Sequence, residues 1–349
     1  MTADAVGGVW TYALELADAL AEHDVEVALA VMGAAPRVDQ REELEASRVA
    51  RVFAADYALE WAEDPWSDVE QAGEWLLRIA DEVEPDVVHL NGYAHAALPW
   101  SVPVVVVGHS DVLSWHEAVR GRPAGEEWGR YRDAVARGLA AADLLVAPTQ
   151  AMLDELIRLY DPACPRIVIP NGSARDFPRR PQEEVVLTTG RLWDDAKNVH
   201  TLVRVAPRLS WPVAVVGAGA VGGGVRFLGR LDRDALDAAY ASASIFCAPA
   251  RYEPFGLAAL EAARAGCALV LGDLPTLREV WGDAALLVPP DDDERLAEAL
   301  QALIDDRKLR AGYAARARRR ARRYPTDRTA RGYLDAYARV LHRAQVEVA

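Results

Sequence analysis

Two glutamates in residues 248–267, APARYEPFGLAALEAARAGC, have the type and spacing to face one crevice and bind hydroxyl groups there. Glu253 falls in a short loop after an apolar run, and Glu261 falls in a segment of helical pattern with seven residues between them. Carboxylates accept hydrogen bonds from sugar and ribose hydroxyls, and the first amides of a helix bind phosphate. Three such backbone N–H groups are expected to be free at the helix start, those of Phe255, Gly256 and Leu257.

The elements that would position this segment alternate along the whole chain. Apolar, β-branched runs follow one another with amphipathic segments such as 68–84 between them. The runs are continuous rather than alternating, which is typical of parallel strands covered on both faces. We therefore expect an α/β fold with doubly wound parallel sheets. The predicted strands are 25–32, 50–55, 86–90, 102–108, 143–148, 166–170, 185–190, 211–217, 225–229, 244–250, 267–272 and 285–289.

The chain reads as two similar α/β halves joined by a polar segment. Residues 171–184, NGSARDFPRRPQEE, are rich in proline, glycine and charge, as interdomain linkers are. Residues 326–345 have helical periodicity and follow Pro325, and proline favours a helix start. At the other end, Gly7 and Gly8 open a helical pattern. Only MTADAV precedes them, so the first strand is expected to be truncated or to begin upstream.

Charge and composition restrict the partners. Of the net charge of −14, residues 1–175 contribute −17 and residues 176–349 contribute +3. The acidic first half argues against nucleic acid and anionic lipid as partners, and it places any anion binding in the second half. No apolar stretch approaches the roughly 20 residues that span a bilayer, and the first residues lack a signal-peptide pattern. Three cysteines without metal-ligand spacing predict reduced thiols in a cytoplasmic protein; they are Cys164, Cys247 and Cys267.

A glycine-rich segment imitates a dinucleotide-binding turn. In residues 213–224, VAVVGAGAVGGG, the glycines Gly217, Gly219 and Gly222 have the G-x-G-x-x-G spacing. A dinucleotide site needs a helix directly after these glycines, whereas a strand-like run, VRFLG, follows here. We therefore predict a loop between two strands and no NAD or FAD site.

Two charged runs allow a functional and a structural interpretation. Asp291, Asp292 and Asp293 contain a D-x-D spacing that can hold a metal, but they also precede a helical segment, where acidic side chains cap helices. Capping is the favoured interpretation, and no metal site is predicted. The run ARARRRARRYP (315–325) could bind nucleic acid or a membrane. Its arginines are spread around a helix with little aromatic interleaving, which favours a solvated helix.

The segment from Glu253 to Glu261, E-P-F-G-L-x-x-L-E, resembles the E-x7-E signature of the retaining glycosyltransferases of family 4. The resemblance covers nearly the whole chain, because further family motifs stand in the same order. They are the Gly7-Gly8 turn, His109 at a strand end, Pro170-Asn171-Gly172, and TTGRLWDDAKN (188–198).

The resemblance implies the GT-B fold, in which two Rossmann-like domains face each other across a cleft. It implies an acceptor-binding domain over residues 1–175 and a nucleotide-sugar-binding domain over residues 176–325. A final helix over residues 326–349 is expected to return to the first domain.

The resemblance also assigns roles to individual residues. Arg191 and Lys197 would bind the donor diphosphate, although their loop holds one residue more than is usual in the family. Arginine can grip two phosphate oxygens and lysine adds a point charge. The alternative is that these cations form surface ion pairs with Asp194 and Asp195. His109 would contact the transferred sugar, and the implied catalytic set is His109, Arg191, Lys197 and Glu253.

Further contacts to donor and acceptor follow from the same resemblance. Gly7, Gly8 and His109 would bind the acceptor, with Gly8 also near the donor. Leu231 would lie against the nucleotide base. Glu261 would hold the ribose diol, and the phosphates would rest on the amides that begin the helix after Gly256.

The activity implied is transfer of a hexosyl group from a nucleoside-diphosphate sugar to an acceptor hydroxyl. Configuration would be retained, and neither a metal nor a cofactor would be needed. Two alternatives stay open: another GT-B enzyme such as a nucleotide-sugar epimerase, and a non-catalytic nucleotide-sugar-binding protein. The base, the sugar, the acceptor and the oligomeric state are not specified by the sequence, although the acidic first half disfavours a polyanionic acceptor.

Overall fold

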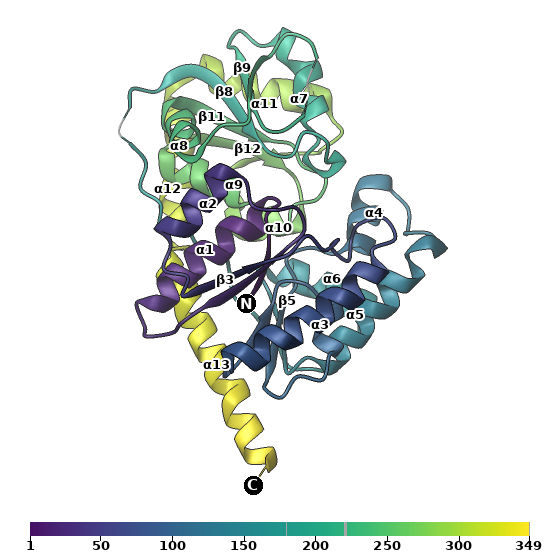
Figure 1. Cartoon of the computed structure of the whole chain (residues 1–349). Helices are drawn as coiled ribbons and strands as arrows, with labels where there is room; N and C mark the ends of the chain where they lie inside the picture. Colours follow the sequence, from purple (N-terminus) through teal and green to yellow (C-terminus); the bar gives the residue numbers. More distant parts are fainter. Residues whose placement is uncertain (179, 220–221, 349) are drawn as a thin grey trace. The chain divides into compact units, whose positions relative to one another are not determined.

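The computed structural model of the chain describes residues 1–178, 180–219 and 222–348. The chain forms two compact units, which are described separately (Figure 1). The first unit comprises Met1–Gly172 together with the segment from Thr326 onward, and the second comprises Ser173–Pro325. Among the described residues, no helix is both long enough and apolar enough to cross a bilayer.

The first unit is built on parallel strands in the orders β1-β2-β3 and β4-β5-β6-β7. The buried strand β5 consists of four valines, whose branched side chains suit a sheet covered on both faces. Within the described residues its strands are β1 (Thr2–Asp4), β2 (Ala28–Met32), β3 (Arg51–Ala54), β4 (Val88–Leu90), β5 (Val104–Val107), β6 (Leu144–Ala147) and β7 (Arg166–Val168).

Helices alternate with these strands, as predicted for βαβ units. The helices of the first unit are α1 (Gly8–Ala21), α2 (Val38–Ala46), α3 (Trp66–Val83), α4 (Val112–Arg120), α5 (Gly129–Ala141), α6 (Gln150–Tyr160) and α13 (Thr326–Val348), with 3₁₀ turns η1 (Ala94–Ala97) and η2 (Glu126–Trp128). The final helix α13 packs against α1. Gly332 of α13 lies close to Ile169, and Thr329 donates to the carbonyl oxygen of Pro170 at 2.8 Å. The helix therefore returns to the first unit, as the resemblance implied.

A side chain joins the two sheets of the first unit. Asn91, directly after β4, donates from its backbone N–H to Thr2 Oγ1 at 2.9 Å. Its side-chain Nδ2 donates to the Thr2 carbonyl oxygen at 2.7 Å. These bonds link the short strand β1 to the residue that follows β4.

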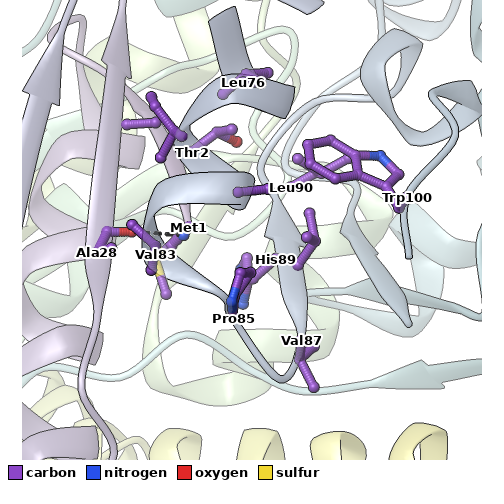
Figure 2. Close-up of a pocket in the computed structure, with 14 residues that line it drawn as sticks. Met1, Thr2, Ala28, Leu76, Val83, Pro85, Val87, His89, Leu90 and Trp100 are labelled. Atoms are coloured by element: carbon purple, nitrogen blue, oxygen red, sulfur yellow. Dashed lines mark hydrogen bonds between the residues drawn. The ribbon is translucent and has the colours of Figure 1, made fainter. Parts of the chain in front are cut away.

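A small cavity lies beside β1 and β4 in the first unit (Figure 2). It has a volume of about 50 Å³ and is lined mainly by apolar side chains such as Leu76, Val83 and Trp100. The amino group of Met1 donates to the carbonyl oxygen of Ala28 at 2.7 Å at its edge. Small-molecule sites typically enclose roughly 300–1,000 Å³, so this cavity is too small for a nucleotide sugar.

Close packing of α5 gives a stability prediction. A Cβ added at Gly138 would overlap the backbone carbonyl oxygen of Tyr93, whereas one added at Gly129 of the same helix meets nothing within 4 Å. Gly138→Ala should lower the free energy of unfolding by about 3 kcal/mol, because a backbone atom cannot move aside cheaply. Gly129→Ala, at a position with φ −58°, should leave it unchanged or raise it by up to about 1 kcal/mol. Urea unfolding of both variants checks this, and equal stabilities would contradict it.

The second unit has one parallel sheet in the order β10-β9-β8-β11-β12-β13. Within the described residues its strands are β8 (Glu183–Thr189), β9 (Val213–Val216), β10 (Arg226–Gly229), β11 (Ala243–Ala248), β12 (Ala268–Gly272) and β13 (Leu286–Val288). Its helices are α7 (Val199–Val205), α8 (Arg233–Ser242), α9 (Leu257–Ala265), α10 (Pro275–Trp281), α11 (Asp293–Asp305) and α12 (Arg307–Ala321), with 3₁₀ turns η3 (Asp195–Lys197), η4 (Ala206–Arg208) and η5 (Gly282–Ala284).

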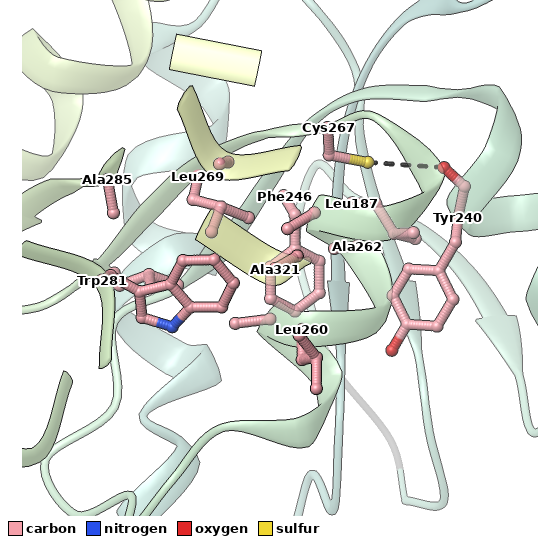
Figure 3. Packing of buried hydrophobic residues seen from close by; sticks show 14 of the residues in the cluster. Leu187, Tyr240, Phe246, Leu260, Ala262, Cys267, Leu269, Trp281, Ala285 and Ala321 are labelled. Carbon is pink, nitrogen blue, oxygen red and sulfur yellow. Dashed lines mark hydrogen bonds between the residues drawn. The ribbon is translucent and has the colours of Figure 1, made fainter. Parts of the chain in front are cut away.

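Apolar side chains cover both faces of this sheet. On one face, Phe246, Leu269 and Trp281 belong to a cluster of buried residues that includes Ala262 of α9 and Ala321 of α12 (Figure 3). A second cluster includes residues of β9, α7 and α11. Burial on both faces explains why the strands are continuous apolar runs in the sequence.

The strand order reverses between β8 and β11, which are neighbours in the centre of the sheet. In doubly wound sheets, ligands bind outside the carboxyl ends of the strands at such a point, because the loops there diverge to opposite faces. The loop after β8 carries Arg191 and Lys197, and the loop after β11 carries Glu253.

Candidate functional site

The two loops at the strand reversal are fixed to one another by their backbones. The N–H of Arg251 donates to the carbonyl oxygen of Ala196 at 2.8 Å. The buried side chain of Asn198 donates to the carbonyl oxygen of Pro249 at 2.9 Å. The loops are thus held together by bonds within the chain itself.

The structure brings Lys197 and Glu253 into direct contact. Lys197 Nζ lies 2.6 Å from Glu253 Oε2, and both side chains are partly buried. The lysine therefore pairs with the glutamate of the neighbouring loop and not in the alternative ion pair that the sequence left open. Because both side chains are only partly buried, the Lys197 ammonium and the Glu253 carboxylate can each exchange this partner for a polar group of a ligand.

The turn before α9 corrects one expectation. The N–H of Gly256 is not free: it donates to Glu253 Oε1 at 3.0 Å, because the loop glutamate turns back toward this backbone group. Gly256 has φ +88°, a left-handed conformation that favours glycine. The N–H groups of Phe255 and Leu257 have no partner among the described residues, so two of the three predicted amides are available. The Phe255 ring is buried and packs on Tyr324, which anchors the turn.

Arg191 is held by its own loop. Its Nε and Nη2 lie 3.2 and 2.6 Å from Asp194 Oδ2. Its guanidinium lies 5.4 Å from the ring centroid of Trp193, which is 59% exposed. Burial opposes the charge of Asp194, yet the Arg191 guanidinium holds the pKa of that carboxyl below its usual range. The ion pair with Asp194 that the sequence left open is thus formed. Nη1 of Arg191 has no partner within the part of the chain that the structure describes.

Glu261 belongs to a buried cluster of charges that the sequence analysis did not find. The residue is 6% exposed, and its Oε1 lies 2.6 Å from Arg233 Nη2 and 3.7 Å from Arg175 Nε. Asp237 completes the cluster at 2.7 Å from Arg175 Nη1. Both arginines approach Oε1, and within the described ranges Oε2 accepts no hydrogen bond. Hydrogen bonding therefore holds the carboxylate at one of its two oxygens.

The spacing of Arg233 and Asp237 was the signal for this cluster. Opposite charges four residues apart face each other on a helix, and the two side chains lie 3.5 Å apart on α8. Their burial beside Glu261 depends on packing of α8 against α9, which local spacing does not reveal. Leu231 lies two residues before Arg233, between β10 and α8, and it packs partly buried against the core.

In the first unit, His109 follows β5 and is partly buried. Its Nε2 lies 2.9 Å from Asn91 Oδ1, and its ring meets the edge of Tyr12 at a centroid distance of 4.4 Å. His89, at 3% exposure, lies deeper beside the same asparagine. Burial lowers the pKa of both histidines from 6.5 to about 3, so both rings are neutral at pH 7.

The predicted glycine turn is present at the start of α1. Gly7 has φ +81° and precedes Gly8, the first residue of the helix. Both glycines are exposed. The first strand, β1, pairs in parallel with β2 over three residues.

The lowered pKa of His89 predicts an acid-dependent loss of stability. Between pH 6.5 and 3 the unfolded chain binds a proton that the folded chain does not, so the free energy of unfolding falls as the pH falls. His89→Gln should reduce this slope by up to about 1.4 kcal/mol per pH unit. Urea unfolding of the variant and wild type at several pH values between 4 and 7 measures the difference. Identical slopes would mean that His89 titrates normally.

The two charged runs have structural partners. Asp292 caps α11 by accepting from the N–H of Arg295 at 2.9 Å, which confirms the capping interpretation. Asp293 pairs with Arg204 at 2.8 Å. On α12, Arg316 and Arg320 donate to backbone carbonyl oxygens of the second unit. Among the described residues, no group of three or more His, Cys, Asp or Glu side chains is placed to hold a metal ion.

The glycine-rich segment joins β9 to β10, as predicted. The N–H of Gly217 donates to the carbonyl oxygen of Gly229 at 2.9 Å, and the described residues between the two strands form no helix. Residues 220 and 221 of this loop lie outside the described residues. The described geometry lacks the helix that a dinucleotide turn requires.

Comparison with known proteins identifies the family. The model for glycosyltransferase family 4 matches residues 6–177, and the model for glycosyl transferases group 1 matches residues 183–306. A D-inositol 3-phosphate glycosyltransferase of Xylanimonas cellulosilytica is 30% identical over 313 residues, 74% of this chain and 73% of that protein. The chain belongs to glycosyltransferase family 4, and its fold is GT-B.

Other relatives and structures agree with this assignment. A phosphatidyl-myo-inositol mannosyltransferase of Mycolicibacterium smegmatis is 38% identical over 184 residues, 45% of this chain and 48% of that protein. The chain spans about half to two thirds of the length of the first curated relatives it matches. Sucrose-phosphate synthase from Thermosynechococcus elongatus has the same fold with a TM-score of 0.79 at 20% identity, over 96% of this chain and 94% of that one. HepE of Anabaena, solved with UDP and glucose, has a TM-score of 0.73 at 17% identity over 95% and 96% of the two chains.

Proposed function

We propose that this chain transfers a hexosyl group from a nucleoside-diphosphate sugar to an acceptor hydroxyl, with retention of configuration and without a metal ion. The observation that carries the proposal is the contact of Lys197 with Glu253 at the strand reversal. In a member of glycosyltransferase family 4, the glutamate of this ion pair lies in the loop that leads into α9, the helix that carries Glu261.

The diphosphate of the donor would be held by charge. Lys197 and Arg191 offer cations, and the N–H groups of Phe255 and Leu257 offer donors at the positive end of α9. A hydrogen bond to a charged group contributes about 1.5–3 kcal/mol. Several such bonds would neutralise the charge that develops on the departing phosphate, which is the part a divalent ion plays elsewhere.

The ribose would be held by Glu261. Its fixed Oε1 sets the direction of Oε2, which accepts hydrogen bonds from the ribose hydroxyls. Glu253, already bonded to Lys197 and to the Gly256 N–H, would accept from hydroxyls of the sugar. His109, neutral at pH 7, would contact the same sugar.

The transfer step needs no protein base. The bond between the anomeric carbon and the diphosphate oxygen breaks, and the acceptor oxygen forms its bond on the same face of the sugar. The proton of the acceptor hydroxyl passes to the departing phosphate oxygen. Lys197 and Arg191 stabilise the charge left on that phosphate.

The relatives of this chain support a sugar nucleotide as substrate. Relatives are named as mannosyltransferases and a glycogen synthase, and HepE was solved with UDP and glucose. The base and the sugar that this chain uses are not assigned by these names.

A screen in the presence of EDTA tests the proposal. Thermal shift with UDP-, GDP-, ADP- and TDP-sugars identifies the donor, and transfer to a panel of hydroxyl acceptors is then followed by NMR of the anomeric proton. We expect a product with the configuration of the donor. An inverted product, an epimerised nucleotide sugar without transfer, or donor binding without turnover for any acceptor would each contradict the proposal.

A further inference from the structure

The orientation of the Asn91 side chain is fixed by a backbone carbonyl. The atom 2.7 Å from the Thr2 carbonyl oxygen must be a donor, because a carbonyl oxygen only accepts. That atom is therefore the amide nitrogen Nδ2. The amide oxygen Oδ1 points to the opposite side, where two imidazole rings lie.

The amide oxygen determines which nitrogen of each histidine carries the proton. Asn91 Oδ1 lies 2.9 Å from His109 Nε2 and 3.2 Å from His89 Nε2. An amide oxygen only accepts, so both Nε2 atoms must be donors. Because burial keeps both rings neutral, each ring is the Nε2–H tautomer with an unprotonated Nδ1.

His89 satisfies this assignment on both nitrogens. Its Nδ1 lies 2.6 Å from the hydroxyl of Tyr337 on α13, which donates to it. The Tyr12 hydroxyl is 3.4 Å from its Nε2. The hydrogen-bond partners of His89 therefore fit the Nε2–H tautomer on both ring nitrogens.

His109 differs from His89 at Nδ1. Within the described residues, its Nδ1 has no hydrogen-bond partner, and the ring is held at Nε2 by Asn91 and packs against the ring of Tyr12. His109 is also the less buried of the two histidines. A neutral imidazole with a free Nδ1 offers a single lone pair and no donor to a ligand.

We propose that Asn91 is a positioning residue that fixes His109 in the Nε2–H tautomer, so that Nδ1 accepts a hydrogen bond from a hydroxyl of the substrate sugar. The sugar contact rests on the proposed function, whereas the tautomer does not. The ligand class follows from the chemistry: His109 selects a hydroxyl donor and discriminates against a deoxy or O-methyl sugar at that position.

Long-range ¹H–¹⁵N NMR of the full chain labelled in its histidines tests the tautomer directly. The signals of His109 and His89 are assigned by their loss in His109→Gln and His89→Gln. We expect both to show a protonated Nε2 and an unprotonated Nδ1 at pH 7. A protonated Nδ1 on His109 would overturn the proposal whether or not the chain transfers sugar. In Asn91→Ala, the His109 signals should shift toward a mixture of tautomers, and unchanged signals would contradict the positioning role.

A matched pair at His109 tests the sugar contact and leaves Asn91 intact. An asparagine places its side-chain oxygen at the distance of Nδ1 from the backbone, and a glutamine places its nitrogen at the distance of Nε2. His109→Asn should therefore retain about tenfold more kcat/KM than His109→Gln, the size of one hydrogen bond. Equal losses, or a greater loss in His109→Asn, would refute the contact. If no donor turns over at all, the proposed function fails while the tautomer assignment still stands or falls on NMR.

Discussion

Replacing Lys197 by alanine should lower kcat/KM for sugar transfer by roughly 10- to 100-fold, the value of one charge-assisted hydrogen bond to a phosphate. The variant should still fold, because the Lys197 side chain is only partly buried. The loss should therefore appear in catalysis and not in the free energy of unfolding. Lys197→Arg should recover only part of the activity, since the planar guanidinium cannot occupy the place of an ammonium beside Glu253.

The chain provides a matched control for this experiment. Its sequence contains one further lysine, Lys308, which is exposed on α12 in the same unit. Lys308→Ala removes the same group and should leave kcat/KM unchanged. A Lys197→Ala enzyme within twofold of wild type would remove Lys197 from the diphosphate site.

Replacing Glu261 by alanine should abolish the preference for ribose over 2′-deoxyribose in the nucleotide. In wild type, a 2′-deoxynucleoside diphosphate should bind about tenfold more weakly than its ribose counterpart, because one hydrogen bond to a carboxylate is missing. In Glu261→Ala the two ligands should bind equally, and donors with different sugars should weaken to the same extent.

Loss of Glu261 also removes the partner of Arg233. The two side chains are 2.6 Å apart and mostly buried, so the variant should be less stable by roughly 3 kcal/mol. The ratio of affinities for the ribose and deoxyribose ligands is insensitive to that change. Glu261→Gln, which keeps an oxygen for Arg233, is the control for folding. A ratio that stays at about ten in Glu261→Ala would exclude the ribose contact, as would weakening of one sugar donor alone.

Much of the fold could be predicted because the physical signals are local. The four valines of β5 and the apolar run of β11 are continuous. Such continuous apolar runs are typical of parallel strands covered on both faces. The glycine-rich segment before β10 could be predicted as a loop between two strands, because a strand-like run follows it directly. In these places residue type and spacing determine the outcome.

The finer contacts of the candidate site could not be predicted because they depend on tertiary packing. The hydrogen bond from the Gly256 N–H to Glu253 Oε1 requires the loop to fold back on itself. The partner of Glu261, Arg233, comes from a different helix, and its charge pattern alone fits an ordinary surface ion pair. Asn91 meets His109 because Thr2 orients its amide, and no spacing connects these three residues in the sequence.

Binding of nucleoside phosphates in EDTA tests the central claim most directly, namely that cations and helix amides at the strand reversal hold a diphosphate without a metal. Calorimetric titration should compare UDP and GDP with UMP and GMP, each with and without added Mg²⁺. We expect the preferred diphosphate to bind at least about tenfold more tightly than its monophosphate, with no gain from Mg²⁺. Equal affinity for mono- and diphosphate, or binding that appears only when Mg²⁺ is added, would contradict the account.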